Sequence, residues 1–419
     1  MIKPLNRPYD VLVIGGGAAG MMAAGTAAQN GRRVCLVEKN AKPGRKLMIT
    51  GKGRCNITNA CDIQTFIASV PTNGRFLYSA ATQFTPQDTV GFFESMGLKT
   101  KVERGNRVFP ESDKAADVVD SLVRYMKNGK VDIVTAEVRR LLIKEHTVSG
   151  VELQGGSQLL ADAVIVCCGG ASYPATGSTG DGYRLARQAG HMVTELRPSL
   201  VPLVVFGDEC AEMMGLSLKN IAIKVLDTEK NKVIYHDFGE MLFTHFGLSG
   251  PVILSASAHM REMKKERYHI LVDLKPALSL EQLDTRLQRD FESSLNRDFC
   301  NSLNALLPRK MIPIMVARSG IPPEVKCNQI TKDMRRSFVD LLKNFEFSVS
   351  GFRPISEAIV TSGGVKVGEI NPKTMESKLV SGLYFAGEVI DVDAYTGGFN
   401  LQIAFCTGRL AANSILNEG

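Results

Sequence analysis

Three glycines near the start of the chain have the spacing of a loop that holds phosphate groups. Gly15, Gly17 and Gly20 follow a short apolar run at residues 10–14 and open a stretch of small residues at 17–30. Such a run suits a buried parallel strand, and such a stretch suits a tightly packed helix. Glycines at this spacing let backbone N–H groups approach a pyrophosphate at the positive end of the helix dipole. The glycines alone are a weak signal, and the prediction depends on the strand before them and the helix after them.

A second apolar run, residues 33–38, completes a βαβ unit and ends in an acidic side chain. Glu38 follows the glycines at about 20 residues, where a carboxylate accepts hydrogen bonds from a ribose diol and repels a 2′-phosphate. We therefore predict a Rossmann-like α/β fold that binds a dinucleotide. The alternative is a glycine turn that only packs the helix on the strand.

Two later apolar runs also end in residues suited to a ligand. Residues 161–170 finish with two cysteines and two glycines, and residues 382–391 bring Gly387 and Glu388 to a strand end. A cofactor extended over two groups of loops needs such a second contact region. For this reason FAD fits the sequence better than NAD.

Residues 50–60, TGKGRCNITNA, contain two glycines, two cations, a thiol and two asparagines, with few apolar residues. We expect that this stretch is not part of the core. Its backbone amides and polar side chains then face a ligand, or it is a solvated loop with incidental charges.

Four long motifs resemble those of one family of bacterial flavoproteins. They are PGRKLMITGKGRCNITN (43–59), CCGGASYPATGSTGDGY (167–183), MLFTHFGLSGP (241–251) and LYFAGEVIDVDAYTGGFNLQIAF (383–405). In these segments the chain is similar to the BaiN-type NAD(P)/FAD-dependent oxidoreductases, also called the aminoacetone-oxidase family. The resemblance covers essentially the whole chain. It implies a two-dinucleotide-binding-domain flavoprotein with an inserted β-rich domain and a helical segment.

The resemblance also implies where FAD lies along the chain. In similar proteins the segment after the second strand runs along FAD toward its isoalloxazine ring. Gly44, Arg45 and Lys46 are then expected at the phosphate and ribityl groups. The full set of expected cofactor-binding residues is Gly15, Gly17, Ala18, Ala19, Gly20, Glu38, Lys39, Gly44, Arg45, Lys46, Gly53, Arg54, Cys55, Asn56, Thr58, Asn59, Val138, Cys168, Gly169, Gly170, Asp181, Gly387, Glu388, Gly397, Gly398, Asn400, Leu401 and Gln402.

The last five of these residues, from Gly397 to Gln402, are expected to precede an apolar helix. Exposed amides at a helix N-terminus stabilise negative charge, here on the N1–C2=O edge of a reduced flavin. Asp181 follows a turn that resembles one near the flavin in relatives. It either lies near the cofactor or caps the following helix.

Candidates for the catalytic group are His245, Tyr173 and Tyr395. His245 lies in a motif, residues 244–251, that resembles the stretch where the inserted domain of the family meets the flavin domain. Its imidazole is expected either near the substrate or as a hinge residue that satisfies backbone groups. The two tyrosines are alternative proton donors.

Cysteine pairs offer two alternative interpretations. Cys55 and Cys61 could form a redox dithiol beside the flavin, but they have five residues between them in a polar stretch instead of four on a helix. Adjacent Cys167 and Cys168 rarely bridge, because the geometry strains the peptide between them, and we expect small core residues there.

The composition is that of a globular chain of about two to three domains. Of its 419 residues, 44% are hydrophobic and 22% are charged. The 50 cations and 43 anions give a net charge of +7, and the basic residues are scattered, so we do not expect nucleic-acid binding.

The glycine cluster and polar residues within 11–31 argue against a signal sequence or membrane span. The nine cysteines lack paired CxxC spacing, which predicts reduced cytoplasmic thiols and no metal site.

The texture of the sequence changes between residues 196 and 352. Short strand-like runs come first, followed by a charged helical stretch at about 279–342, and glycine-rich, strand-like sequence resumes at Val360. We therefore predict an FAD-binding domain formed by residues 1–195 and 353–419. It is interrupted by a β-rich substrate or cap domain. The strand-like runs are VPLVVF, IAIKVLD, KVIYHD and YHILVDL.

Three functions are compatible with the sequence. The first is an FAD-dependent reductase that takes hydride from NAD(P)H and reduces an activated C=C bond of a small or steroid-like substrate, as the bile-acid-operon members of the family suggest. The second is an aminoacetone-type amine oxidase that releases hydrogen peroxide, and the third is a flavin-bearing RNA-binding protein without turnover. Because no second convincing GxGxxG unit is present, a nicotinamide donor would dock only transiently. The sequence does not indicate an oligomeric state.

Overall fold

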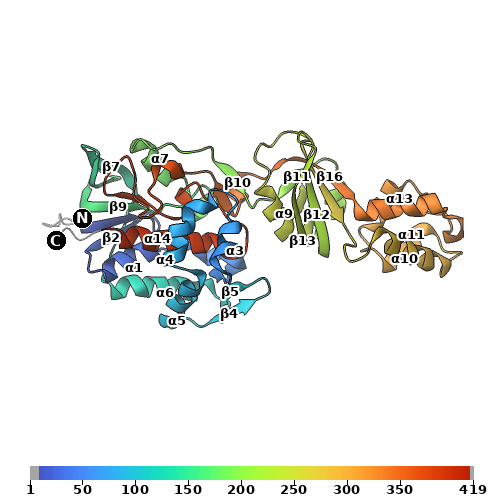
Figure 1. Ribbon diagram of the computed structural model, residues 1–419, viewed down its shortest axis with the longest axis horizontal. Coiled ribbons are helices and arrows are strands. Elements are labelled where there is room, and N and C mark those ends of the chain that lie inside the picture. Colours follow the sequence, from blue (N-terminus) through green and yellow to red (C-terminus); the bar gives the residue numbers. More distant parts are fainter. Residues whose placement is uncertain (1–8, 416–419) are drawn as a thin grey trace. The chain divides into compact units, whose positions relative to one another are not determined.

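The computed structural model describes residues 9–415, which form two compact units (Figure 1). The first unit runs to Ser199 and resumes at Pro354, and the second is Leu200–Arg353. The boundaries predicted from the sequence fall after residues 195 and 352.

The first unit begins with the predicted βαβ arrangement. Strand β1 (Tyr9–Ile14) lies parallel to β2 (Val34–Glu38), and helix α1 (Ala18–Gln29) connects them. The prediction of a tightly packed helix is confirmed, because all ten residues from Ala18 to Ala27 are buried. Gly25 shows why they must be small: a Cβ there would overlap the ring of Tyr125.

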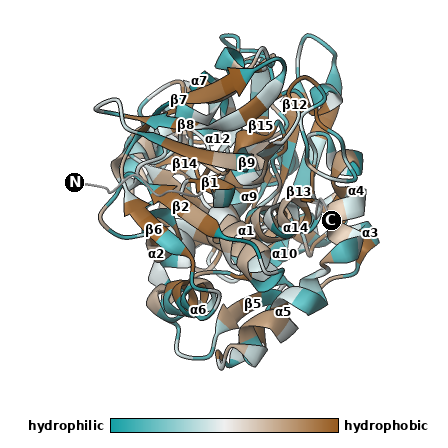
Figure 2. Cartoon of the chain, turned by 90° about the vertical axis from the view of Figure 1, so that its left-hand side faces the viewer, coloured by the Kyte–Doolittle hydropathy of each residue, from teal (hydrophilic) through white to brown (hydrophobic). Residues whose placement is uncertain are grey.

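These elements belong to a seven-stranded sheet with the order β6-β2-β1-β9-β8-β7, in which β18 also pairs with β9. The parallel strands β2 and β9 are largely brown in Figure 2, as expected for strands covered on both faces. The C-terminal strand β18 lies parallel to β9, with Leu383 opposite Val164, so both ends of the chain build one sheet. The remaining strands of this sheet are β6 (Asp132–Thr135), β7 (Val138–Lys144), β8 (Thr147–Leu153), β9 (Gln158–Val166) and β18 (Leu383–Phe385).

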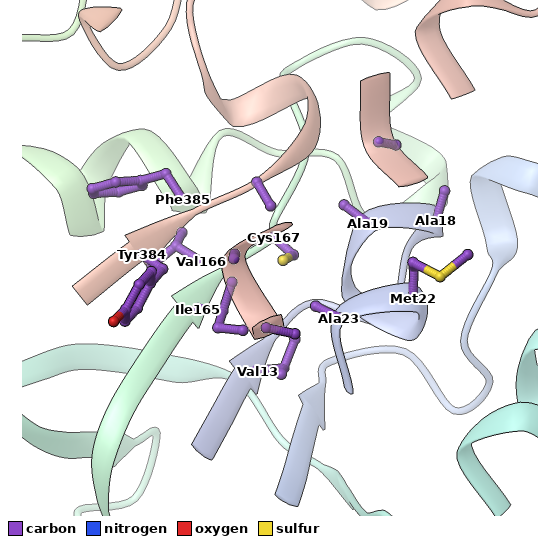
Figure 3. Packing of buried hydrophobic residues seen from close by; sticks show 14 of the residues in the cluster. Val13, Ala18, Ala19, Met22, Ala23, Ile165, Val166, Cys167, Tyr384 and Phe385 are labelled. Atoms are coloured by element: carbon purple, nitrogen blue, oxygen red, sulfur yellow. The ribbon is translucent and has the colours of Figure 1, made fainter. Parts of the chain in front are cut away.

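The core of this unit is formed by apolar residues of the sheet and of the helices packed against it. Figure 3 shows Val13 of β1, Ile165 of β9 and Ala23 of α1 in this core. Helices α6 (Ala115–Asn128) and α14 (Phe399–Asn413) both pack against α1. The other elements of the unit are α2 (Arg45–Ile49), β3 (Thr58–Asn59), α3 (Ile63–Ala68), α4 (Tyr78–Gln83), α5 (Pro86–Ser95), β4 (Thr100–Glu103), β5 (Arg107–Pro110), α7 (Asp181–Gln188), β10 (Arg197–Ser199) and β17 (Val360–Ser362).

The second unit is a closed six-stranded barrel with a group of helices. The strands follow the order β11-β14-β13-β12-β15-β16, and the unit has its own apolar core. All four strand-like runs of the sequence lie on barrel strands, and the charged stretch forms helices that end at Lys343. The elements are β11 (Leu203–Val205), α8 (Glu209–Glu212), β12 (Ser217–Asp227), β13 (Lys232–Thr244), β14 (Gly247–Ser249), α9 (Pro251–Ser257), β15 (Tyr268–Asp273), α10 (Leu280–Glu292), α11 (Phe299–Ser302), α12 (Ile312–Ser319), α13 (Lys332–Lys343) and β16 (Phe345–Phe352).

Two findings concern the environment of the chain. Among the described residues, no helix is both long and apolar enough to cross a bilayer. All nine cysteines lie within the described residues, and none is in a disulfide.

Candidate functional site

The glycine turn between β1 and α1 leaves an open space in front of the helix. Gly15 has φ +99°, and a Cβ at Gly20 would overlap the carbonyl oxygen of Gly15, so both positions need glycine. Gly17 is different, because apart from Gly17 itself and its two chain neighbours no described heavy atom lies within 4 Å of the place where its Cβ would be. Gly17 is also the N-cap of α1 and makes no side-chain cap hydrogen bond. The first N–H groups of α1 thus have no side-chain cap, and the free position beside Gly17 is compatible with a phosphate at this helix N-terminus.

Glu38 lies at the end of β2 beside this turn. Its Oε2 accepts a hydrogen bond from the N–H of Gly16 at 2.6 Å, and its Oε1 accepts two from Asn40 at 2.7 Å. A carboxylate has about four acceptor positions, so one remains for a ribose hydroxyl.

Next to Glu38, Lys39 pairs with Asp181 at 2.5 Å. Asp181 is the first residue of α7 and does not cap it, since Gly180 is the N-cap. The capping interpretation of Asp181 is wrong.

Two of the expected cofactor-binding residues, Lys46 and Glu388, pair with each other. The Nζ of Lys46 lies 2.8 Å from Oε2 of Glu388, and the other carboxylate oxygen accepts from Ser172 and from the N–H of Thr361. Glu388 therefore holds four separate segments together. Its neighbour Gly387 has φ +76° and donates its N–H to the Thr407 hydroxyl at 2.9 Å.

The loops that surround this pair are also closely packed. The N–H of Gly44 donates to the carbonyl of Gly16, which brings the start of α2 to the glycine turn. Arg45 donates to the side chain of Asn40 at 3.0 Å. After β9, a Cβ at Gly170 would crowd Thr361 and Glu388, whereas Gly169 has more room. The small residues Gly169 and Gly170 thus let separate loops meet beside the glycine turn and the N-terminus of α1.

The prediction that residues 50–60 lie outside the core is wrong for their second half. Cys55, Ile57 and Thr58 are completely buried, because β3 adds to the strands β5 and β4 and packs under α14. Gly51, Lys52 and Cys55 all have left-handed backbones, which turn the chain inward before β3. The polar composition concealed this burial because most of the polar groups in this half are satisfied internally.

Most of the side chains expected to face the flavin in this stretch already have protein partners. Arg54 pairs with Glu103 and Asp113 at 2.5 Å each and lies over the ring of Phe109. Thr58 donates to Gln402, and Asn59 donates to the carbonyl groups of Gly105 and Gly397. Asn56 is the exception, because its buried Oδ1 has no hydrogen-bond partner.

The redox dithiol is not supported. Complete burial raises the pKa of the Cys55 thiol to about 12, and burial also raises the pKa of Cys61. A reactive thiol needs the opposite shift, since the thiolate is the nucleophile. Burial raises the pKa of Cys168 to about 12. The expectation of core residues holds for Cys167, which is buried, whereas Cys168 is partly buried and packs against the core.

Helix α14 begins one residue after Gly398, so the expectation that Asn400, Leu401 and Gln402 precede it is wrong. These three residues lie in its first turn. The Asn400 side chain bonds to the backbone of Ala394, and Gln402 is fully buried among other hydrogen-bonding groups. Gly398, with φ +99°, is the N-cap and makes no side-chain cap hydrogen bond. The N–H groups of the first turn of α14, and not these side chains, are the candidates for contact with a flavin.

The remaining predicted residues lie at several places. Val138 is the buried first residue of β7, and its carbonyl accepts from Arg184 at 2.8 Å. Tyr173 and Tyr395 are half-buried residues of the first unit, whereas His245 is exposed in the turn between β13 and β14 of the second unit.

Sequence reasoning missed Asn40, Ser172, Thr361 and Thr407, although all four bond to predicted site residues. Isolated hydroxyl and amide groups give no local sequence signal. A cavity of about 570 Å³ lies elsewhere, lined by residues such as Leu98, Glu111 and Arg124, and none of the predicted site residues lines it. Within residues 9–415 no cluster of side chains suits a metal ion.

A family model described as the HI0933-like protein Rossmann domain matches residues 9–414. The chain belongs to this family. A 3-dehydro-bile acid delta(4,6)-reductase of Clostridium scindens is 32% identical over 96% of this chain and 98% of its own length. Ribosomal RNA dihydrouridine synthases of Escherichia coli and Haemophilus influenzae are 30% and 31% identical, over 97% and 99% of this chain and 98% and 100% of their own.

The fold is shared with solved flavoenzymes. A 3-ketosteroid-delta4-(5alpha)-dehydrogenase from Rhodococcus jostii has a TM-score of 0.53, 13% identity, and coverage of 99% of this chain and 98% of its own. A flavocytochrome c3 fumarate reductase has a TM-score of 0.52, 17% identity, and coverage of 98% of this chain and 78% of its own. This member of the HI0933-like family is therefore an FAD-dependent oxidoreductase with a Rossmann-type fold. The open space at Gly17, the uncapped helix N-termini and the unpartnered Asn56 fit a bound FAD.

Proposed function

We propose that this protein reduces a C=C bond conjugated to a carbonyl group, with NAD(P)H as the hydride donor. The observation that carries the proposal is full-length similarity to relatives with two different names that share one chemistry. One name specifies reduction of double bonds in a 3-oxo steroid. The other specifies dihydrouridine, which is uridine with its C5=C6 bond, conjugated to a carbonyl group, reduced.

The chain's own residues would support this reaction by holding the cofactor and by supplying a proton. Bound FAD supplies the hydride transfer. The N-terminus of α1 would hold the pyrophosphate, and the N–H groups of the first turn of α14 would stabilise negative charge on the flavin. The substrate also needs a proton beside its carbonyl group, for which Tyr173, Tyr395 and His245 are the candidates. The second unit would serve as the substrate or cap domain.

The first candidate substrate is a steroid-like enone, in keeping with the C. scindens relative. The test is anaerobic mixing of the FAD-loaded protein with NADH or NADPH, followed by a 3-oxo-4-ene steroid. We expect the visible flavin absorbance to bleach with one nucleotide and to return when the enone is added. Absorbance that stays unchanged with both nucleotides would contradict the donor assignment.

A second candidate substrate is a uridine in ribosomal RNA. It is favoured by two relatives of that name and would reverse the expectation that nucleic acid is not a partner. Incubation of unmodified ribosomal RNA with the protein and NADPH, followed by mass spectrometry of the nucleosides, tests it. Dihydrouridine should accumulate only in complete reactions, and its absence would remove RNA as a substrate.

The amine oxidase and the non-catalytic RNA-binding flavoprotein stay predictions of lower rank. Peroxide release with small amines would support the first, and salt-sensitive RNA binding without product would support the second. A cytoplasmic location is also a proposal, supported by the nine unpaired cysteines.

A further inference from the structure

Asn56 presents a polar atom that the protein itself does not satisfy. Among the described residues, its Oδ1 is the one buried side-chain nitrogen or oxygen without a hydrogen-bond partner. An unmade hydrogen bond at a buried acceptor lowers stability, so such atoms are rare in folded proteins. The nearby Asn59 shows the usual case, because its amide donates to two carbonyl groups at 3.0 and 3.1 Å.

The backbone fixes Asn56 in this position. On one side the N–H of Cys55 donates to the carbonyl of Thr50 at 3.0 Å, and on the other the N–H of Ile57 donates to Val108 at 2.8 Å. Cys55 itself has φ +59°, a conformation that costs free energy for a residue with a Cβ. Gly51 leaves little free room, since a Cβ there would lie 3.1 Å from the backbone nitrogen of Asn56 and 3.9 Å from its Cβ. The amide is therefore held beside a turn that the chain adopts at an energetic cost.

We propose that the Asn56 carboxamide pairs with the imide edge of a pyrimidine ring, an N–H group flanked by carbonyl groups. The inference rests on the proposed function. A carboxamide carries an acceptor and a donor side by side, so it can make two hydrogen bonds with an imide in either rotation of the amide. A steroid enone offers only an acceptor and would leave Oδ1 unsatisfied. The imide has two possible sources, the pyrimidine ring of the flavin and the uracil base of a substrate.

Exposed cations next to this stretch are compatible with the uracil source. Arg104 lies in the β4–β5 turn, which the side chain of Asn59 joins through the carbonyl of Gly105, and Arg107 is the first residue of β5. Lys52 is exposed in the turn before Asn56. In the described part of the chain none of these three cations is in an ion pair, although Arg107 donates to the carbonyl of Arg104 at 3.0 Å, and phosphate groups of RNA would supply a counter-charge.

The first part of the test is the variant Asn56→Leu, compared with Asn59→Leu as a matched control. Leucine removes the unsatisfied oxygen at position 56, so the urea midpoint of the FAD-free protein should stay the same or rise. At position 59 leucine removes two hydrogen bonds, so the midpoint should fall. A fall of equal size in Asn56→Leu would overturn the proposal, because it would show that Asn56 is satisfied within the protein.

The second part separates the two sources by binding alone. FAD and N3-methyl-FAD are titrated into the FAD-free protein, and UMP and N3-methyl-UMP into the FAD-loaded protein, with flavin fluorescence as the readout. If the flavin is the source, Asn56→Leu weakens FAD about tenfold, and the wild type binds N3-methyl-FAD as weakly. If uracil is the source, FAD affinity is unchanged, and UMP binding falls by a similar factor in the variant and on N3-methylation.

An Asn56→Leu variant that binds FAD and UMP as the wild type does would overturn the proposal. So would a wild type that does not distinguish either N3-methylated compound from its parent. None of these measurements needs turnover. A protein that fails to reduce any conjugated C=C bond but shows either pattern would contradict the proposed function and leave the imide contact established.

Discussion

Gly17 is the residue at which the fold and the cofactor make different demands. Its backbone, with φ −81°, is open to any residue, and apart from Gly17 and its two chain neighbours no described heavy atom lies within 4 Å of the place of a Cβ. We therefore expect Gly17→Ala to change the free energy of unfolding of the FAD-free protein by no more than about 1 kcal/mol. The new methyl group would occupy the space in front of α1, so FAD affinity should fall about tenfold or more. Urea unfolding and fluorescence titration measure the two effects.

Gly20→Ala is the matched control for this prediction. A Cβ at residue 20 would overlap the carbonyl oxygen of Gly15, so the variant should lose about 2 kcal/mol of stability before FAD is added. If Gly17→Ala binds FAD normally, the glycine turn is not the phosphate site.

A second residue-level prediction concerns pH. His191 is buried, with Nε2 at 2.7 Å from the hydroxyl of Ser377 and Nδ1 at 3.2 Å from Glu369. The Ser377 oxygen already accepts from two backbone N–H groups, so its proton points to the imidazole and favours the neutral ring. Burial lowers the pKa of His191 from its ordinary value of 6.5, although Glu369 opposes the shift.

Below pH 6.5 the imidazole of His191 therefore binds a proton more readily in the unfolded chain than in the folded chain. For this reason the free energy of unfolding falls as the pH decreases. We expect the urea midpoint to drop more between about pH 7.5 and 5.5 in the wild type than in His191→Gln. The difference between the two pH slopes is the readout, since acidic residues affect both proteins alike. Equal slopes would show that His191 does not titrate differently on folding.

Among the elements, helix α14 is joined to its neighbours by the hydrogen bonds of one buried amide, the side chain of Gln402. The Oε1 of Gln402 accepts from the hydroxyls of Thr58 and Thr89 at 2.7 Å, and its Nε2 donates to the carbonyl of Phe84 at 2.9 Å. Gln402→Leu would remove these three hydrogen bonds and leave the buried Thr58 hydroxyl and Phe84 carbonyl without this partner, whereas the Thr89 hydroxyl keeps the carbonyl of Thr85 as an acceptor at 3.2 Å. We expect a loss of about 2–4 kcal/mol in the free energy of unfolding of the FAD-free protein, measured in urea. Unchanged stability with weaker FAD binding would instead return Gln402 to the cofactor-contacting set.

The elements also show what the sequence could predict. Periodicity and small residues predicted β1, α1 and β2 to within one residue at each end, because each has a strong local pattern. The burial of Cys55 and Thr58 was not predictable, since it depends on a two-residue strand and on α14, which is far away in the chain. The same applies to Glu388, whose partner Lys46 is 342 positions away. Local patterns carry no information about such pairs.

At the scale of the whole molecule, the second unit is connected so that it can be removed. The two ends of the second unit lie close together, because the N–H of Arg353 donates to the carbonyl of Pro202 at 3.0 Å. The flanking residues of the first unit are also close, because Ser199 pairs with Val360. Each unit also has a core of its own. We expect that replacing residues 200–353 with a short Gly/Ser linker leaves a protein that still binds FAD but has lost substrate turnover.

Flavin absorbance after gel filtration, together with an activity assay, checks this prediction. The isolated segment 200–353 should unfold in a single cooperative transition. A linker variant that retains full turnover would show that the second unit is not a substrate domain.

The central claim is that electrons pass from the flavin to a C=C bond conjugated to a carbonyl group. The most direct measurement uses the FAD-loaded protein, reduced with one equivalent of dithionite without oxygen and mixed with a conjugated acceptor in a stopped-flow instrument. We predict that a 3-oxo-4-ene steroid or a uridine-containing ribosomal RNA restores the oxidised flavin spectrum, whereas the corresponding saturated ketone or dihydrouridine does not. Reduced flavin that is reoxidised by oxygen but by neither conjugated acceptor would contradict the account.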